Sequence, residues 1–93
     1  MSEQMIIPDE IRLHWYSDPG HSWLAVPRWL ADQVPGFEPS VFSHKSSKRY
    51  FFEEDEDAPR FLQALRQHRP GIVIGKLETH TNEDSFVRAL PCC

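Results

Sequence analysis

Residues 44–57 read HKSSKRYFFEEDED, a run that passes from cations through three aromatic side chains to five carboxylates. The pattern predicts a hairpin with a basic tip, whose second strand, residues 48–53, leads into the acidic start of a helix. Phe51 lies on one face of this strand, and Tyr50 and Phe52 lie on the other. The strand is therefore expected either to be covered on both sides or to carry an apolar outer face.

A helix is predicted directly after the acidic run. Asp57 is a good N-cap, Pro59 suits the first turn, and Arg69-Pro70-Gly71 ends the helix. Its apolar stripe consists of Phe61, Leu62 and Leu65. Carboxylates precede the positive end of this helix and basic side chains lie near its negative end, so the charges of the segment suit the helix dipole.

The chain beyond this helix is expected to form one strand and one or two helical turns. Ile72-Val73-Ile74 is a β-branched run typical of a buried strand, and Gly75 indicates a bulge or bend before an alternating segment that ends at His80. Thr81 or Asn82 can cap the last turns. Their inward side chains are expected to be Phe86, Val87 and Leu90.

A hairpin is also predicted near the N-terminus. Residues 11–16 alternate between apolar and polar side chains, as a strand with one covered face does. Ser17-Asp18-Pro19-Gly20 supplies a turn, in which Pro19 presets φ and Gly20 accepts a positive φ. The returning strand covers residues 21–26.

A short helix over residues 27–34 follows, with Val26 at the cap position and Pro35-Gly36 as its end. Residues 40–45 then form the first strand of the second hairpin. The element order is ββ-α-ββ-α-β-α. We expect one α+β domain over residues 1–93, with a mostly antiparallel sheet of about four to five strands and two to three short helices on one face.

Bulk composition limits the classes of function. The 93 residues carry a formal net charge of -4, which argues against generic binding to nucleic-acid phosphates. No apolar run reaches the ~20 residues that span a bilayer. Cys92 and Cys93 are adjacent and cannot close a useful loop, so we expect free thiols in a reducing cytoplasm.

Candidate catalytic and metal-binding groups form no recognisable constellation. The five histidines include no His-x-x-x-His pair, glycines are scattered singly, and no Gly-x-Ser-x-Gly motif occurs, so neither a metal nor a cofactor is expected. Asp18 and His21 are the best catalytic pair, since a carboxylate can orient an imidazole as a general base, and they leave a small hydrolase as one alternative. The other interpretation is a turn aspartate that accepts hydrogen bonds from its own backbone.

Two charged segments are candidate binding surfaces. Glu53, Glu54, Asp55 and Glu56, with Tyr50 and Phe52 of the preceding strand, can present carboxylates and aromatic rings to a basic partner. The alternative is that the acidic run only serves the helix start. Lys45, Lys48 and Arg49 can contact phosphate, as in a nucleic-acid-binding accessory protein, or they can simply protect a sheet edge.

The segment Tyr16–Pro27 resembles short uncharacterised proteins of bacteriophages and other bacterial mobile elements. The resemblance extends to Tyr50, Glu53-Glu54-Asp55, Asp57-Ala58 and Phe61. It implies the cytoplasm of a host cell as the setting and a host protein or complex as the partner, including the nuclease complexes of bacterial defence. The hypothesis is a non-catalytic binding protein that inhibits such a complex through its acidic surface, as anti-CRISPR proteins do.

Overall fold

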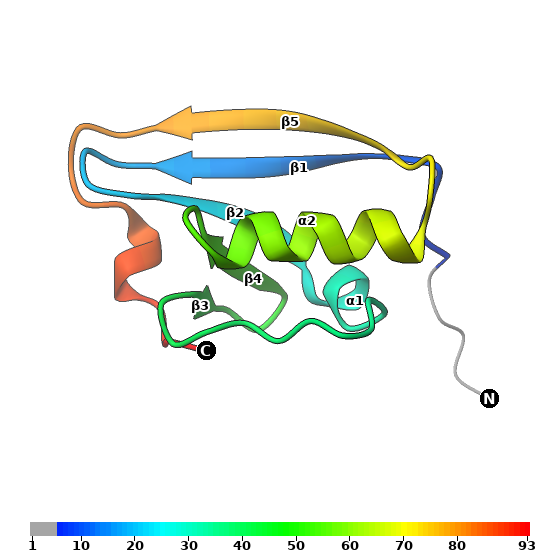
Figure 1. The fold of residues 1–93 in the computed structure, drawn as a ribbon. Helices are drawn as coiled ribbons and strands as arrows, with labels where there is room; N and C mark the ends of the chain where they lie inside the picture. The colour runs from blue at the N-terminus through cyan, green and yellow to red at the C-terminus, as the bar shows by residue number, and fades with distance from the viewer. Residues whose placement is uncertain (1–5) are drawn as a thin grey trace.

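The computed structural model describes residues 6–93, which form a five-stranded sheet, two α-helices and a 3-10 helix (Figure 1). The strands are β1 (Glu10–Ser17), β2 (Ser22–Pro27), β3 (His44–Lys45), β4 (Arg49–Glu53) and β5 (Val73–His80). The helices are α1 (Arg28–Ala31), α2 (Asp57–His68) and the 3-10 helix η1 (Phe86–Ala89). The predicted α+β class and element order are confirmed.

The sheet has the strand order β3-β4-β2-β1-β5 and is antiparallel except at β1 and β5. The parallel pair follows from the path of the chain. Helix α2 returns the chain along the sheet between β4 and β5, so β5 runs in the same direction as β4 and β1. The sheet is thus mostly antiparallel, as predicted, with one parallel edge strand.

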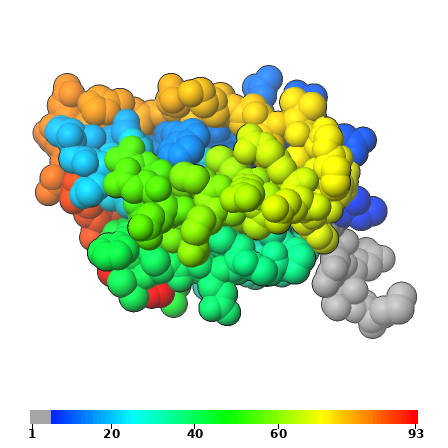
Figure 2. Space-filling model, viewed as in Figure 1, coloured from blue at the N-terminus to red at the C-terminus, as the bar shows by residue number. Residues whose placement is uncertain are grey.

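The main core lies between the sheet and the two α-helices. Side chains of the sheet, among them Leu24 and Phe52, pack against Phe61 and Leu65 of α2 and Leu30 of α1, and all five are essentially inaccessible to solvent. Figure 2 shows α2 across the near face of the molecule. Because α2 presents an apolar stripe to the sheet, its position is the consequence of the 3.6-residue repeat seen in the sequence.

A second, smaller core lies on the opposite face of the sheet. Trp23, Ala25 and Phe51 pack there against Val87 of η1. The expectation of helices on one face is therefore wrong, since η1 covers the other. Phe51 and Phe52 are adjacent and both fully buried, which confirms that β4 is covered on both sides.

Several predicted helix boundaries differ from the structure. Helix α1 has four residues and begins after Pro27, not Val26. Helix α2 already includes Asp57, and its N-cap position is Glu56. The cap of η1 is Ser85, whose hydroxyl accepts a hydrogen bond from the Val87 N–H. The starts of α1 and α2 differ from the prediction by one residue, which is the usual uncertainty of a helix boundary.

The strand predictions also need correction. The first strand of the second hairpin is reduced to His44–Lys45. Gly75 lies in the uninterrupted β1–β5 register, so no bulge occurs there, and β5 is exposed at the sheet edge, with Val73 57% accessible. Gly20 has no positive φ; in residues 6–93 this conformation occurs at Gly36 and Gly71. Phe86 is 49% exposed and so does not point fully inward.

Candidate binding pocket beside the acidic loop

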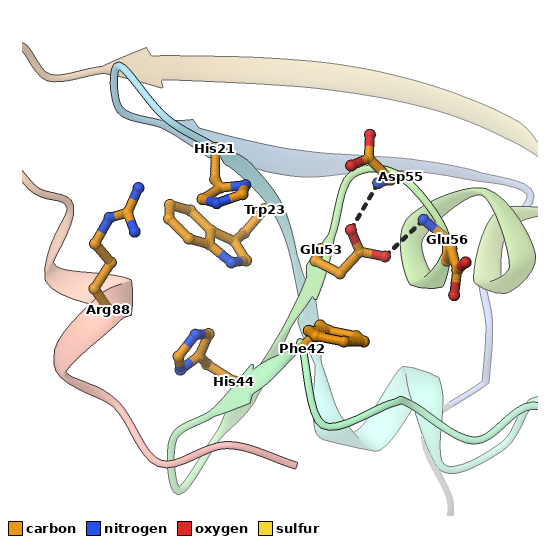
Figure 3. Close-up of a pocket in the computed structure, with 8 residues that line it drawn as sticks. All are labelled: His21, Trp23, Phe42, His44, Glu53, Asp55, Glu56 and Arg88. Carbon is orange, nitrogen blue, oxygen red and sulfur yellow. Dashed lines mark hydrogen bonds between the residues drawn. The ribbon is translucent and has the colours of Figure 1, made fainter.

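A pocket of about 440 Å³ opens where β2, β3 and β4 meet the loop before α2. Its lining residues come from four segments of the chain: His21, Trp23, Phe42, His44, Glu53, Asp55, Glu56 and Arg88. Figure 3 shows His21, Trp23, His44 and Arg88 grouped on one side, and the carboxylates with Phe42 on the other. The acidic run is therefore folded against aromatic side chains.

Trp23 forms the floor of this pocket. It is 3% exposed, and it lies opposite Glu53 in the antiparallel β2–β4 register. The His44 ring meets it edge-on at 6.1 Å, and the Arg88 guanidinium carbon lies 5.3 Å from its ring centroid. Contacts from β3 and η1 thus fix the indole from two directions.

Glu53 orders the acidic loop, residues 54–56, which joins β4 to α2. Its carboxylate accepts hydrogen bonds from the backbone N–H groups of Asp55 (2.8 Å), Glu56 (2.6 Å) and Asp57 (2.8 Å). The Asp57 N–H is the first of α2, where donors lack intrahelical acceptors, and the other two N–H groups lie in the turn just before it. Glu53 therefore stabilises the helix start, a role that the sequence predicted for Asp57.

Asp55 and Glu56 have exposed side chains beside the pocket. Among residues 6–93, no hydrogen bond or ion pair engages either carboxylate. Phe42, 69% exposed, completes the same rim. Within the described part of the chain, the pocket thus offers two carboxylates without a hydrogen bond or ion pair, and an exposed ring on which a ligand can stack.

Other residues of the predicted acidic and aromatic surface lie elsewhere. Glu54 lines a different depression, next to Trp15 and Glu78. Phe52 is fully buried, so it offers no area to a partner of the folded chain. Tyr50 is half-buried and donates its hydroxyl to Asp32 at 3.2 Å. The structure thus brings Glu53, Asp55 and Glu56 together at the pocket. The other predicted members of this surface, Glu54, Tyr50 and Phe52, do not line it.

The basic side chains of the β3–β4 hairpin do not line the pocket. Arg49 folds back onto the sheet, where it donates to the Tyr16 hydroxyl at 3.3 Å and its guanidinium carbon lies 4.9 Å from the Phe51 ring centroid. Lys48 is exposed and Lys45 is half-buried. The predicted basic tip is therefore separate from the pocket. Of its three cations, Arg49 is engaged by aromatic rings.

Asp18 does not orient the His21 imidazole. Its buried carboxylate accepts backbone hydrogen bonds from Gly20, His21 and Ser85, at 2.9 to 3.0 Å. Arg88 donates to both carboxylate oxygens, at 2.6 and 2.9 Å. The interpretation of Asp18 as a turn residue that binds its own backbone is confirmed, and its five donors also tie the β1–β2 turn to η1.

The Arg88 contact also explains Gly20. A Cβ atom at this position would lie 2.7 Å from Arg88 Nη2, so the guanidinium would have to shift from its place beside Asp18. The glycine therefore allows the close approach of the guanidinium, and its φ is not positive.

Arg88 holds the pKa of Asp18 far below its usual range, and the backbone N–H donors add to this effect while burial opposes it. A carboxyl group with a depressed pKa in the folded chain stabilises that chain above its ordinary pKa of about 4, and the contribution is lost as the pH falls further.

We expect the urea midpoint of wild type to drop between about pH 5 and pH 2. The midpoint of Asp18→Asn should drop less over the same range. Arg88→Gln should reduce the same pH dependence. An unchanged slope in both variants would contradict this role.

The histidines are distributed over separate contacts. His14 and Thr79 share a hydrogen bond, as do Ser17 and His80, and the His44 imidazole binds the Leu90 carbonyl. Within residues 6–93 no three His, Cys, Asp or Glu side chains are placed to hold a metal ion. The same residues include no helix that could cross a bilayer.

The sequence analysis missed four lining residues of this pocket. Trp23, His44 and Arg88 come from three separate segments of the chain, and no local pattern assigns them to one site. Phe42 lies in a loop without periodicity, so no local pattern marks it. Phe42 follows Val41 inside the strand that was predicted over residues 40–45, whereas the structure leaves it in the loop before β3.

No family model, curated protein or solved structure matches the chain. The chemistry of the pocket is therefore the basis for assigning a function.

Proposed function

We propose that this chain is a non-catalytic binding protein that accepts an arginine side chain of a partner protein in the pocket of Trp23, Phe42 and the acidic loop. The observation that carries the proposal is the placement of Asp55 and Glu56, two carboxylates without a hydrogen bond or ion pair among residues 6–93, beside the exposed ring of Phe42. A guanidinium group suits both features, since it pairs with carboxylates in a planar fork and stacks on aromatic faces.

The charge balance of the pocket favours a cation. Three carboxylates line it, against one guanidinium, that of Arg88. Arg88 is already paired with Asp18, so its charge is largely compensated inside the chain. The volume of about 440 Å³ lies within the ~300–1,000 Å³ range of small-molecule sites, which leaves room for one or two long side chains.

The resemblance to phage and mobile-element proteins supports a particular class of partner. Host proteins that bind nucleic acids present arginines and lysines for phosphate contacts. A small protein that pairs its carboxylates with those cations would occupy the same surface and compete with the nucleic acid. We propose a nucleic-acid-binding protein of a host defence complex as the partner.

Peptide titration tests the side-chain preference. The probes are three capped pentapeptides, Gly-X-Gly-X-Gly, in which X is arginine, lysine or citrulline, and the readout is Trp fluorescence or calorimetry at low salt. We expect arginine to bind most tightly and citrulline, which keeps the shape but has no charge, to bind at least about tenfold more weakly. Equal affinity for all three peptides would contradict the proposal.

Charge reversal tests the location. Asp55→Lys with Glu56→Lys should weaken arginine-peptide binding by at least about tenfold, because it replaces attraction by repulsion at the rim. Phe42→Ser should weaken binding at unchanged net charge. The matched control is Glu38→Lys with Glu83→Lys, the same charge change on exposed residues outside the pocket. If the control weakens binding equally, net charge alone explains the effect and the pocket is not the site.

One observation favours a second candidate, single-stranded nucleic acid. On β1 the rings of His14 and Tyr16 are stacked at 4.2 Å and 7°, and the Arg49 guanidinium carbon lies 5.7 Å from the Tyr16 ring centroid. Aromatic and cationic side chains on a sheet face bind bases and phosphates in this way. This candidate requires that an oligothymidine bind at low salt, that affinity fall steeply as salt rises, and that Tyr16→Ala remove binding.

A further inference from the structure

Strand β5 is the outermost strand of the sheet. It pairs with β1 on one side, and among residues 6–93 no strand or helix pairs with its other edge (Figure 1). All eight residues of the strand are at least partly exposed, and Leu77 is 47% accessible. Unpaired backbone groups along such an edge are a template for another strand.

The hydrogen-bond pattern shows which residues of β5 face outward. The Val73 N–H donates to Asp9 O at 2.9 Å, and the Thr81 N–H donates to Ser17 O at 3.0 Å. The β1–β5 register is continuous between these bonds, so odd-numbered residues from 73 to 81 direct their backbone groups to β1. The N–H and C=O groups of Ile74, Lys76, Glu78 and His80 therefore point away from the sheet.

A second copy of β5 can pair with this edge in a self-complementary register. In an antiparallel pair, residues with outward backbone groups must face each other, because they exchange both hydrogen bonds. Placing Lys76 opposite Glu78 satisfies this condition and sets Leu77 opposite Leu77 on the two-fold axis. Both Lys76–Glu78 pairs then join opposite charges directly across the strands.

The neighbouring symmetric registers are less favourable. A shift that keeps the outward groups paired places Lys76 opposite Lys76, or Glu78 opposite Glu78. Like charges directly opposite one another destabilise a strand pair. Charges on an edge strand normally discourage pairing. In this strand, however, the segment Lys76-Leu77-Glu78 is complementary in charge to a second, antiparallel copy of itself, because each lysine then lies opposite a glutamate.

We propose that two copies of this chain associate through antiparallel β5 strands, with Lys76 of each copy facing Glu78 of the other, so that the two sheets form one continuous ten-stranded sheet. The pocket takes its strand residues from β2, β3 and β4, and the strand order separates β5 from β2 by β1. Each copy therefore keeps its pocket away from the paired edge. A dimer would present two pockets to a partner with repeated basic side chains, which raises avidity without a new contact.

The test is the molar mass in solution, measured by light scattering and sedimentation at low salt and protein concentrations up to about 1 mM. Wild type is expected to dimerise. Lys76→Glu alone and Glu78→Lys alone each place like charges opposite one another, so each should raise the dissociation constant at least about tenfold. Both side chains are about two-thirds exposed in the isolated chain, so circular dichroism should show an unchanged fold.

Two rescue experiments make the register specific. The double variant, Lys76→Glu with Glu78→Lys, restores opposite charges across the axis and should dimerise as wild type does. An equimolar mixture of the two single variants should form a heterodimer, because the glutamates of one face the lysines of the other. A monomeric wild type at all concentrations, or a dimer that neither single variant weakens, would overturn the proposal. Failure of both rescues would overturn the register and hence the proposal.

Discussion

Asp57→Ala is expected to lower the free energy of unfolding by about 3 kcal/mol. Asp57 is fully buried, and its Oδ2 accepts hydrogen bonds from the Ser40 N–H at 2.7 Å, the Ser40 hydroxyl at 2.8 Å and the Ser43 hydroxyl. Hydrogen bonds to a charged group contribute about 1.5–3 kcal/mol each, and removal of the carboxylate also removes its desolvation cost, so the contributions do not add fully. Urea denaturation of wild type and variant measures the difference.

The expected loss exceeds that of an ordinary cap. An N-cap replaced by alanine typically costs about 1 kcal/mol, and this is the loss to expect if Asp57 acted only as the N-cap predicted from the sequence. The controls are Ser40→Ala, which removes one donor and should cost about 1 kcal/mol, and Asp55→Ala at an exposed site, which should stay within about 0.5 kcal/mol. A loss near 1 kcal/mol for Asp57→Ala would show that the contacts with residues 40–43 add little.

Asp57 also positions the rim of the pocket. It holds Ser40 and Ser43 on either side of Phe42, and Ser43 in turn accepts the Glu53 N–H at 3.0 Å. Removing the carboxylate should therefore loosen the loop that carries Phe42 as well as the start of α2. Hydrogen exchange at residues 40–43 would report this effect separately from global unfolding.

Phe51→Ala is expected to cost about 3–5 kcal/mol, the range for removal of a buried phenylalanine. The ring is inaccessible to solvent and meets Phe86 and Tyr16 at centroid distances of 5.6 and 6.1 Å. It is the largest side chain between the sheet and η1 that is completely buried. Because η1 covers this face with few other apolar contacts, the cavity should weaken its attachment as well as the whole fold.

Phe52→Ala is the matched comparison, since Phe52 is the next residue on the same strand and equally buried, but in the core under α2. Both variants should lose similar global stability. Only Phe51→Ala should increase hydrogen exchange in residues 85–90 at denaturant concentrations where wild type is folded. Phe86→Ala, at a half-exposed position, should cost clearly less than either. Equal exchange in residues 85–90 of the two core variants would contradict the division into two cores.

Elements whose signals are local could be predicted from the sequence. The alternation in residues 11–16 and the Pro-Gly turn specified the first hairpin, and the stripe of Phe61, Leu62 and Leu65 specified α2. The repeat of apolar residues in both elements reflects backbone geometry that acts within a few residues, with a period of two in a strand and of 3.6 in a helix. The same reasoning placed Phe51 and Phe52 on opposite faces of β4.

Only the tertiary structure decided the partners of the polar side chains. Asp18 and Arg88 are 70 residues apart, Asp57 reaches back to Ser40, and Trp23 meets the acidic loop because β2 pairs with β4. No periodicity marks such contacts, because hydrogen bonds and charge pairs depend on which segments the folded chain brings together. The sequence alone determined the apolar faces of the first hairpin, of β4 and of α2. The packing of the strands and helices determined that the edge strand β5 and Phe86 stay exposed, which carboxylates are used inside the fold, and which two remain at the pocket.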